Sequence, residues 1–150
     1  MRRAISLLFD TIQRWELYIS LMPDRYDLWY HVAFSTKYRK HIFTDLKTKE
    51  EVENLFREIA LQYDMKIDRI QVMPDHIHMS VSAPPRIAPS RAVQILKSVS
   101  TRYLFKQYKF LKKFYWGGEV WVQGYFIRSV GPGLTKEQIN KYIDEQSEEI

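Results

Sequence analysis

The 150-residue sequence predicts an α+β fold in which helices pack on one face of an antiparallel sheet. Three observations lead to this class. Segments with strand or helix periodicity follow one another in the order strand, helix, strand, strand, helix, strand, helix. The second and third strands follow one another directly and are joined by a short turn, as in a hairpin. No internal repeat, low-complexity tract or long linker interrupts the order, so the pattern predicts one domain.

The first strand and the first helix are predicted from their periodicity. Residues 30–34 alternate large and small side chains with period two, which predicts a strand. Residues 50–63 carry apolar side chains at helical spacing, with charged side chains on the other side. This pattern predicts a helix with one apolar stripe, formed by Val52, Leu55, Phe56, Ile59 and Ala60.

A hairpin and a second helix are expected next. Residues 67–73 and 76–82 predict two strands, and Pro74-Asp75 between them predicts a turn. Pro89 suits the first position of a helix, because the N–H that proline lacks would have no intrahelical partner there. This helix is expected to end near Lys106.

The C-terminal part repeats the scheme of a strand followed by a helix. Residues 120–130 predict a strand that is interrupted near Gly124, and Gly131-Pro132-Gly133 ends it. Thr135 and Gln138 have the spacing of a capping box, which predicts that the final helix begins there.

The first 22 residues stand apart from this pattern. An apolar stripe at near-helical spacing predicts an amphipathic helix, formed by Ala4, Leu7, Leu8, Ile12, Trp15 and Ile19. We expect an N-terminal extension over residues 1–22 and a single domain over residues 23–150; one interpretation of the extension is that translation starts at Met22. Charges interrupt the apolar stretch and no cleavage site follows, so the expected location is the cytoplasm, with no membrane partner.

The composition limits the available chemistry and favours a nucleic-acid partner. The chain has no cysteine, which excludes disulfides, thiolate metal sites and cysteine nucleophiles. Its formal net charge is +5, and it contains ten tyrosines and four tryptophans. Cations neutralise phosphates and aromatic rings stack on unpaired bases, although many basic proteins bind no nucleic acid.

A pair of histidines on the second hairpin strand is the first candidate site. Because side chains alternate along a strand, His76 and His78 share one face with the serines that follow, and the intervening apolar residues share the other. Two neutral imidazoles side by side can bind Mn²⁺, Zn²⁺ or, with oxygen ligands, Mg²⁺. The alternative is a pair of solvated histidines on an exposed strand, so a metal site requires a further ligand from elsewhere.

The final helix offers such a ligand. Tyr142 and Gln146 are four residues apart and therefore project from one face of the helix. The alternative interpretation is a core stripe, in which Tyr142 packs and Gln146 lies at the edge. A phenol and an amide on one turn, together with a separate pair of histidines, favour a catalytic site.

Four segments, which follow one another in the family's order, resemble the IS200/IS605 transposases, which are HUH nucleases with a single catalytic tyrosine. Residues 72–78 (Val-Met-Pro-Asp-His-Ile-His) resemble the histidine-hydrophobe-histidine motif, and residues 30–39 resemble the first strand of that family. Residues 124–131 and 141–146 resemble its last strand and its Tyr-x-x-x-Gln helix. The match covers about residues 26–147, and the histidine motif combined with Tyr-x-x-x-Gln is highly specific.

The resemblance implies both a fold and a function. It implies an RNA-recognition-motif-like, ferredoxin-like sheet, with Tyr142 as the nucleophile and His76, His78 and Gln146 as ligands of Mg²⁺ or Mn²⁺. It implies a metal-dependent DNA transposase that cleaves and rejoins single-stranded DNA at element ends through a 5′-phosphotyrosine. The expected partners are single-stranded DNA with subterminal hairpins and a second copy of the chain. In such a homodimer the tyrosine helix of one subunit completes the active site of the other, and Gly131-Pro132-Gly133 is the expected hinge.

Basic residues on two segments are candidates for contacts with the DNA backbone. These candidates are Lys37, Arg39, Arg91, Lys97, Arg102 and Lys106. The alternative is that they form a solvated basic face without a ligand. Three alternative functions stay open at this point. They are a domesticated, repeat-associated tyrosine transposase, a non-catalytic module that binds single-stranded nucleic acid, and a metal-dependent hydrolase that uses water as its nucleophile.

Overall fold

A computed structural model describes residues 13–14, 26–131 and 136–146. Its helices and strands, in chain order, are β1 (Trp29–Ser35), the 3-10 turn η1 (Lys37–Arg39), α2 (Leu46–Gln62), β2 (Lys66–Val72), β3 (His76–Ser82), α3 (Pro89–Gln107), α4 (Leu111–Phe114), β4 (Phe126–Ser129) and α5 (Lys136–Gln146). No helix in these ranges has the length and apolar character needed to cross a membrane. Nearly all of the expected N-terminal extension, and Thr135 of the expected capping box, lie outside the described residues.

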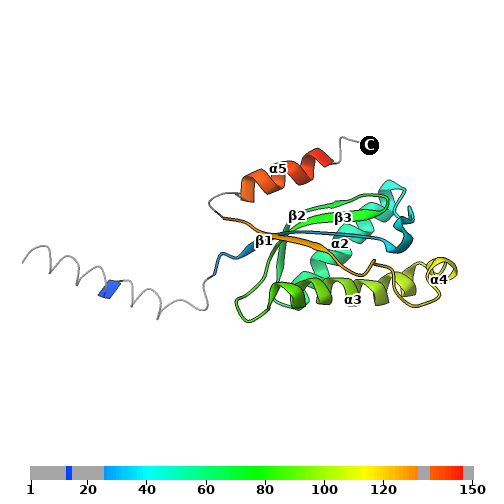
Figure 1. The fold of residues 1–150 in the computed structure, drawn as a ribbon, viewed down its shortest axis with the longest axis horizontal. Helices are drawn as coiled ribbons and strands as arrows, with labels where there is room; N and C mark the ends of the chain where they lie inside the picture. The colour runs from blue at the N-terminus through cyan, green and yellow to red at the C-terminus, as the bar shows by residue number, and fades with distance from the viewer. Residues whose placement is uncertain (1–12, 15–25, 132–135, 147–150) are drawn as a thin grey trace, which may run out of the picture.

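The four strands form one antiparallel sheet in the order β2-β3-β1-β4. The helices α2 and α3 cover one face of this sheet, and α5 lies over the opposite face (Figure 1). The predicted α+β class and the predicted order of elements are therefore confirmed, with the short α4 as an addition. The expected layer of helices on one face consists of α2 and α3.

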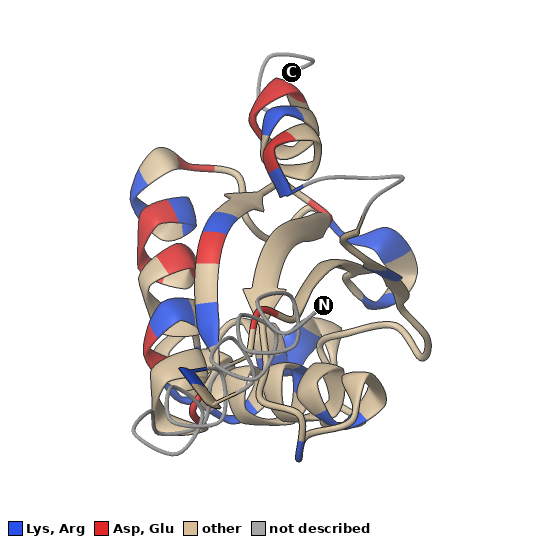
Figure 2. Ribbon diagram, turned by 90° about the vertical axis from the view of Figure 1, so that its left-hand side faces the viewer, with Lys and Arg blue, Asp and Glu red and all other residues tan. Residues whose placement is uncertain are grey.

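The pairing of β1 with β3 separates the side chains of the two central strands into two groups. Ser35 lies opposite His76, Ala33 opposite His78 and His31 opposite Ser80. Directly paired residues project to the same side of a sheet, so these residues share the α5 face. The two central strands contain no Lys, Arg, Asp or Glu, and Figure 2 shows charged residues on the helices and on the neighbouring strands instead.

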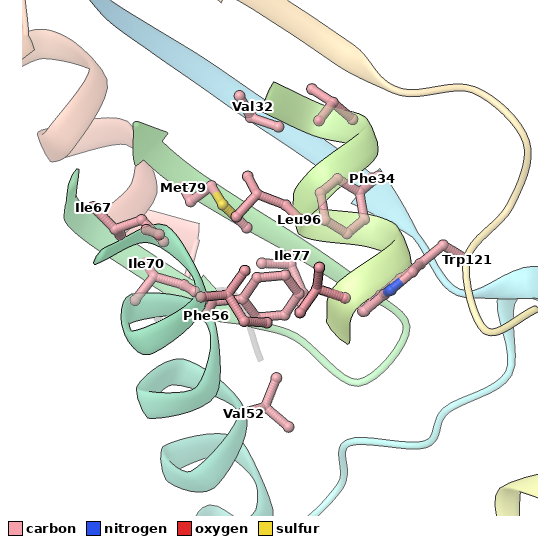
Figure 3. Close-up of a cluster of buried hydrophobic side chains, with 14 of the residues drawn as sticks. Val32, Phe34, Val52, Phe56, Ile67, Ile70, Ile77, Met79, Leu96 and Trp121 are labelled. Carbon is pink, nitrogen blue, oxygen red and sulfur yellow. The ribbon is translucent and has the colours of Figure 1, made fainter. Parts of the chain in front are cut away.

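The hydrophobic core lies between the other face of the sheet and the helices α2 and α3 (Figure 3). From β3, Ile77 and Met79 point into it, and Phe56 of α2 and Leu96 of α3 meet them; all four are at most 1% exposed. Full burial of one such side chain contributes roughly 1.5–3 kcal/mol, so this face supplies most of the stability. Trp121 closes one side of the core.

Two elements differ from the prediction. The first helix begins at Leu46 rather than at residue 50, because the Asp45 side chain accepts the backbone N–H of Thr48 and caps the helix there. In the segment 120–130 only Phe126–Ser129 forms a strand, while Trp121 makes an isolated bridge with Thr36. The interruption expected near Gly124 occurs: this residue has φ +104°, a conformation that glycine adopts without steric cost.

Candidate active site

The two predicted metal ligands lie side by side on β3. The ring centres of His76 and His78 are 5.0 Å apart, and the two rings are nearly perpendicular. His76 is half-buried, whereas His78 is only 9% exposed. The predicted face of the strand is thus confirmed, and the alternative of two solvated side chains does not describe His78.

A carboxylate and a guanidinium orient His76. The Nδ1 atom of His76 lies 2.7 Å from Oδ1 of Asp75, and Nε of Arg39 donates to Oδ2 of the same carboxylate at 3.0 Å. Burial alone would raise the pKa of Asp75, but the hydrogen bonds from His76 and Arg39 outweigh this effect and lower the pKa below its ordinary value. Asp75 is therefore a carboxylate, and it accepts the Nδ1–H of His76.

A third histidine, on β1, contacts His78. The Nε2 atom of His31 lies 3.2 Å from Nδ1 of His78, and the two rings stack with their centres 5.4 Å apart. His31 is 6% exposed, and its ring and that of Phe126 on β4 pack in edge-to-face geometry, with their centres 5.3 Å apart. The strand pairing therefore places three histidines in a row on one face of the sheet.

Burial keeps His78 in the neutral form that metal binding requires. Burial, followed by the charges of His76 and His31, lowers the pKa of His78 to about 4. Burial also lowers the pKa of His31. A cation that binds His78 at neutral pH therefore does not have to displace a proton from it.

The two histidines fit one divalent cation through their Nε2 atoms. Both Nδ1 atoms already have a partner, and among the described residues neither Nε2 atom has a hydrogen bond. Within the same residues, no three His, Asp or Glu side chains gather closely enough to hold a metal ion. Among the described residues, a third protein ligand would therefore be of another type, such as the amide of Gln146 at the end of α5.

The helix α5 packs on the face of the sheet that carries the three histidines, which we call the histidine face. The packing consists of a small apolar contact and several polar contacts. Ile139 and Ile143 are at most 3% exposed. The carboxylate of Asp68 on β2 accepts hydrogen bonds from Asn140 at 2.9 Å and from Lys136 at 3.1 Å. These contacts form within one chain, so the helix that carries Tyr142 rests on its own sheet.

Tyr142 lies beside the histidines. Its ring centre is 5.8 Å from that of His78 and 5.6 Å from that of His31, with edge-on geometry in both pairs. It remains 44% exposed, unlike the two isoleucines of the same helix, so it is accessible from solvent. The structure thus brings together the predicted nucleophile and the predicted histidine ligands, which are 64–66 residues apart in the chain.

The six candidate DNA-binding cations occupy different places. Lys37 and Arg39 lie beside the site, where Lys37 pairs with Glu119 at 3.5 Å and Arg39 with Asp75. The other four are on α3, across the sheet from α5 (Figure 1). Of these, Lys97 donates to the backbone carbonyls of Val122 and Gly124, both at 2.7 Å, and so holds the segment before β4; Arg91, Arg102 and Lys106 are exposed.

Three residues have roles in the site that were not predicted from the sequence. His31 and Asp75 were not among the candidate site residues, and Arg39 was a candidate for DNA contacts but not for the contact with Asp75. Asp75 directly precedes the histidine motif, and a carboxylate next to a metal-binding histidine is a recognisable signal. His31 gives no local signal, because it meets His78 only through the pairing of β1 with β3.

The chain is similar in sequence to known transposases. Residues 24–146 match the family model described as "Transposase IS200 like". The ISDra2 transposase TnpA of Deinococcus radiodurans is 36% identical over 121 residues, which cover 81% of this chain and 85% of that protein. The IS200 transposase of Salmonella typhimurium is 33% identical over 130 residues, covering 87% and 84% of the two chains.

Two solved structures share the fold. One, from Deinococcus radiodurans and assigned as a transposase, has a TM-score of 0.66 and 32% identity, and the match covers 83% of this chain and 95% of the other. The other, a REP-associated tyrosine transposase bound to a REP hairpin, has a TM-score of 0.51 and 12% identity, with 82% and 68% covered, and supports the fold alone. The match over residues 24–146 and the identity to two transposases lead to one conclusion: the chain belongs to the IS200-like transposase family, whose members cleave and transfer DNA strands.

Proposed function

We propose that this transposase cleaves and rejoins single-stranded DNA through a covalent 5′-phosphotyrosine on Tyr142, and that a divalent cation bound by His76, His78 and Gln146 assists the reaction. One observation carries the proposal. An accessible tyrosine lies beside two histidines whose Nε2 atoms have no hydrogen bond among the described residues. A water-activating hydrolase would have no need of that tyrosine.

Tyr142 supplies the nucleophile. Its phenolic oxygen attacks the phosphorus, the bond from phosphorus to the 3′ oxygen breaks, and the 3′ oxygen takes up a proton to become a free hydroxyl. The phenolic proton passes to a base or to solvent. The product keeps a phosphodiester between Tyr142 and the 5′ end, so a second 3′-hydroxyl can reverse the step and join two strands without ATP.

The histidines and Gln146 would hold the cation. When bound, Mg²⁺ or Mn²⁺ would withdraw negative charge from the non-bridging oxygens and stabilise the charge that develops in the transition state. His78 contributes a neutral nitrogen because its pKa is low, and Asp75 holds the ring of His76 through Nδ1. The amide of Gln146 would add an oxygen ligand, which suits Mg²⁺.

DNA hairpins next to the cleaved strand are the proposed partners. A structural neighbour with the same fold is a REP-associated transposase bound to a REP hairpin. In this chain Lys37 and Arg39 lie at the edge of the site, where they can contact phosphates close to the scissile bond. We propose that the exposed Arg91, Arg102 and Lys106 contact a hairpin or a more distant strand, because α3 lies across the sheet from α5, which carries Tyr142 (Figure 1).

A labelled single-stranded oligonucleotide that contains a hairpin and the element end tests the covalent step. Incubation with Mn²⁺ followed by a denaturing gel should show a protein–DNA adduct for the wild type and none for Tyr142→Phe. Tyr125→Phe is the matched control, because Tyr125 has the same 44% exposure but lies outside the histidine site. Cleavage by Tyr142→Phe without an adduct would instead show that water is the nucleophile.

We further propose a homodimer in which α5 docks on the sheet of the partner. The contacts of α5 with Asp68 and its neighbours would be the same on either sheet, so an exchange of this helix creates a dimer at low cost. Gly131 begins the proposed hinge, while Pro132 and Gly133 lie outside the described residues.

Mixing two inactive variants tests this exchange. Tyr142→Phe and His76→Ala should regain activity together, because one composite site of the mixed dimer combines intact histidines with an intact tyrosine. Recovery in the mixed dimers should approach about half of the wild-type activity, since only one of two symmetric sites is whole. No recovery despite measured subunit exchange would contradict the exchanged arrangement and favour the helix placement within one chain.

A further inference from the structure

We infer that His31 is a positioning residue: it accepts a hydrogen bond from Nδ1 of His78 and thereby leaves the lone pair of His78 Nε2 available to the metal. This inference rests on the proposed function, because it requires that His78 binds the cation. It adds a role for a residue outside the histidine motif, on a different strand.

The tautomer of His78 follows from the hydrogen-bonding capacity of a neutral imidazole. Such a ring has one N–H and one lone pair, on opposite nitrogens. The contact between His31 Nε2 and His78 Nδ1, at 3.2 Å, needs one donor and one acceptor. If His31 donated, His78 would carry its proton on Nε2 and could not bind a metal there. If His78 donates, its Nε2 holds the lone pair, and only this arrangement is compatible with the metal site.

His76 has its proton on the same nitrogen as His78, but a carboxylate and not a histidine accepts it. The carboxylate of Asp75 can only accept, so Nδ1 of His76 carries the proton and Nε2 holds the lone pair. Metal-binding histidines generally donate their second N–H to a carboxylate, a carbonyl or water, which fixes the tautomer and the ring orientation. His31 takes the place of that acceptor for His78, so both rings present the same nitrogen to one cation.

The surroundings of His31 hold its ring in place. It is 6% exposed, and it packs in edge-to-face geometry with Phe126 and Tyr142, at 5.3 Å and 5.6 Å between ring centres. Directly opposite in the sheet is Ser80, whose hydroxyl is buried without a hydrogen-bond partner among the described residues. The acceptor nitrogen of His31 is therefore fixed mainly by packing, and it needs no reorganisation when the metal binds.

Binding of Mn²⁺ alone to the full chain, measured by electron paramagnetic resonance, tests the inference through variants of His31. His31→Leu removes the acceptor and fills part of the same space with an apolar side chain. It should weaken Mn²⁺ binding by about 10–100-fold. His31→Gln offers an amide oxygen near the former Nε2 position and should restore most of the affinity. Ser80→Ala removes a neighbouring polar group that has no hydrogen bond, and should bind Mn²⁺ like the wild type.

The outcomes separate this inference from the proposed function. Loss of Mn²⁺ binding in His78→Ala, with wild-type affinity in His31→Leu, would overturn the role of His31 and leave the metal site intact. Wild-type affinity in His78→Ala would overturn the metal site and, with it, the role of His31. A His31→Gln variant as weak as His31→Leu would show that size or packing matters and not the acceptor.

A measurement on the unsubstituted protein avoids the risk that a variant does not fold. Long-range ¹H–¹⁵N correlation spectra distinguish the two tautomers of each neutral histidine. Before metal is added, His76 and His78 should both carry their proton on Nδ1, and Mg²⁺ should shift the Nε2 resonances of both. A proton on Nε2 of His78 in the metal-free protein would overturn the inference.

Discussion

The two faces of the sheet are built in opposite ways, although they alternate along the same strand. On the α2 and α3 face, Ile77, Met79 and Val81 of β3 are at most 1% exposed and pack among other apolar side chains. On the α5 face, the same strand presents His76 and His78, and nearly every partner described for them is polar or aromatic.

This difference separates the source of stability from the site of chemistry. Apolar burial supplies a large, non-directional stabilisation, and a polar group buried within it without a hydrogen bond lowers the stability. The core on one face therefore allows the other face to hold neutral imidazoles and an exposed phenol, which contribute little to stability. Adjacent positions on β3 should respond to substitution in opposite ways, and this contrast can be measured.

The largest effect is expected from the histidines. His76→Ala or His78→Ala should lower the rate of DNA cleavage by about 10³-fold, because the loss of a metal removes several kcal/mol of transition-state stabilisation. Binding of the hairpin DNA should remain near wild type, since neither ring is proposed to contact it. Gel assays of cleavage and fluorescence anisotropy of hairpin binding measure the two effects. Normal cleavage by both variants would contradict the assignment of the two histidines as metal ligands.

Truncation of the neighbouring core residue should produce the reverse pattern. Met79→Ala removes a fully buried side chain next to His78 and should lower the free energy of unfolding by about 2–5 kcal/mol. At temperatures where this variant is still folded, it should cleave DNA with a rate near that of the wild type. Urea unfolding and the cleavage assay check the two parts. A Met79→Ala protein that is stable but inactive would mean that the two faces are coupled.

The sequence predicted the histidine face because alternation along a strand is local. The positions of His76 and His78 depend only on the period of β3, and those of Tyr142 and Gln146 relative to each other depend only on the helical repeat. The order of elements and the fold class followed from the same periodicities. These predictions did not require any knowledge of how distant segments meet.

The parts that were not predicted depend on contacts between distant segments. His31 supports His78 only because β1 pairs with β3 in one register, and a single sequence does not specify that register. The predicted strand 120–130 is shorter because Lys97 of α3 holds the carbonyls of Val122 and Gly124. The same contact gives a structural role to a lysine whose charge alone indicated DNA binding. That prediction is not tested by the structure.

A smaller effect on the cleavage rate is expected from substitution of Gln146, the proposed amide ligand. Gln146→Ala should lower the cleavage rate by about tenfold or less, which corresponds to about 1.4 kcal/mol, because water can replace a neutral oxygen ligand. Excess Mn²⁺ should recover part of the loss if the defect lies in metal affinity. The matched control is Gln62→Ala, which removes the same amide from the last residue of α2. A loss as large as that of the histidine variants would require a second role for Gln146.

The smallest effect concerns the attachment of α5, where the histidine face does contribute to stability. Asp68→Asn weakens the contacts with Lys136 and Asn140, which are partly exposed, so the free energy of unfolding should fall by only about 1 kcal/mol. Hydrogen exchange should nevertheless become faster in α5 and remain unchanged in α2 and α3. Glu58→Gln makes the same change of charge on α2 and should leave the exchange in α5 at the wild-type rate.

The pH dependence of this attachment follows from Asp68 itself. Burial would raise the pKa of Asp68, but the hydrogen bonds from Asn140 and Lys136 outweigh it, so the pKa lies below its ordinary value of 3.8. Between the lowered pKa and 3.8 the unfolded chain binds more protons than the folded one, so stability increases with pH in this window. The contribution is complete above the window and is lost as the pH falls through the lowered pKa. The change of the Lys136 and Asn140 amide signals at acidic pH should therefore be smaller in Asp68→Asn than in the wild type, whereas identical titrations would show that another group controls the helix.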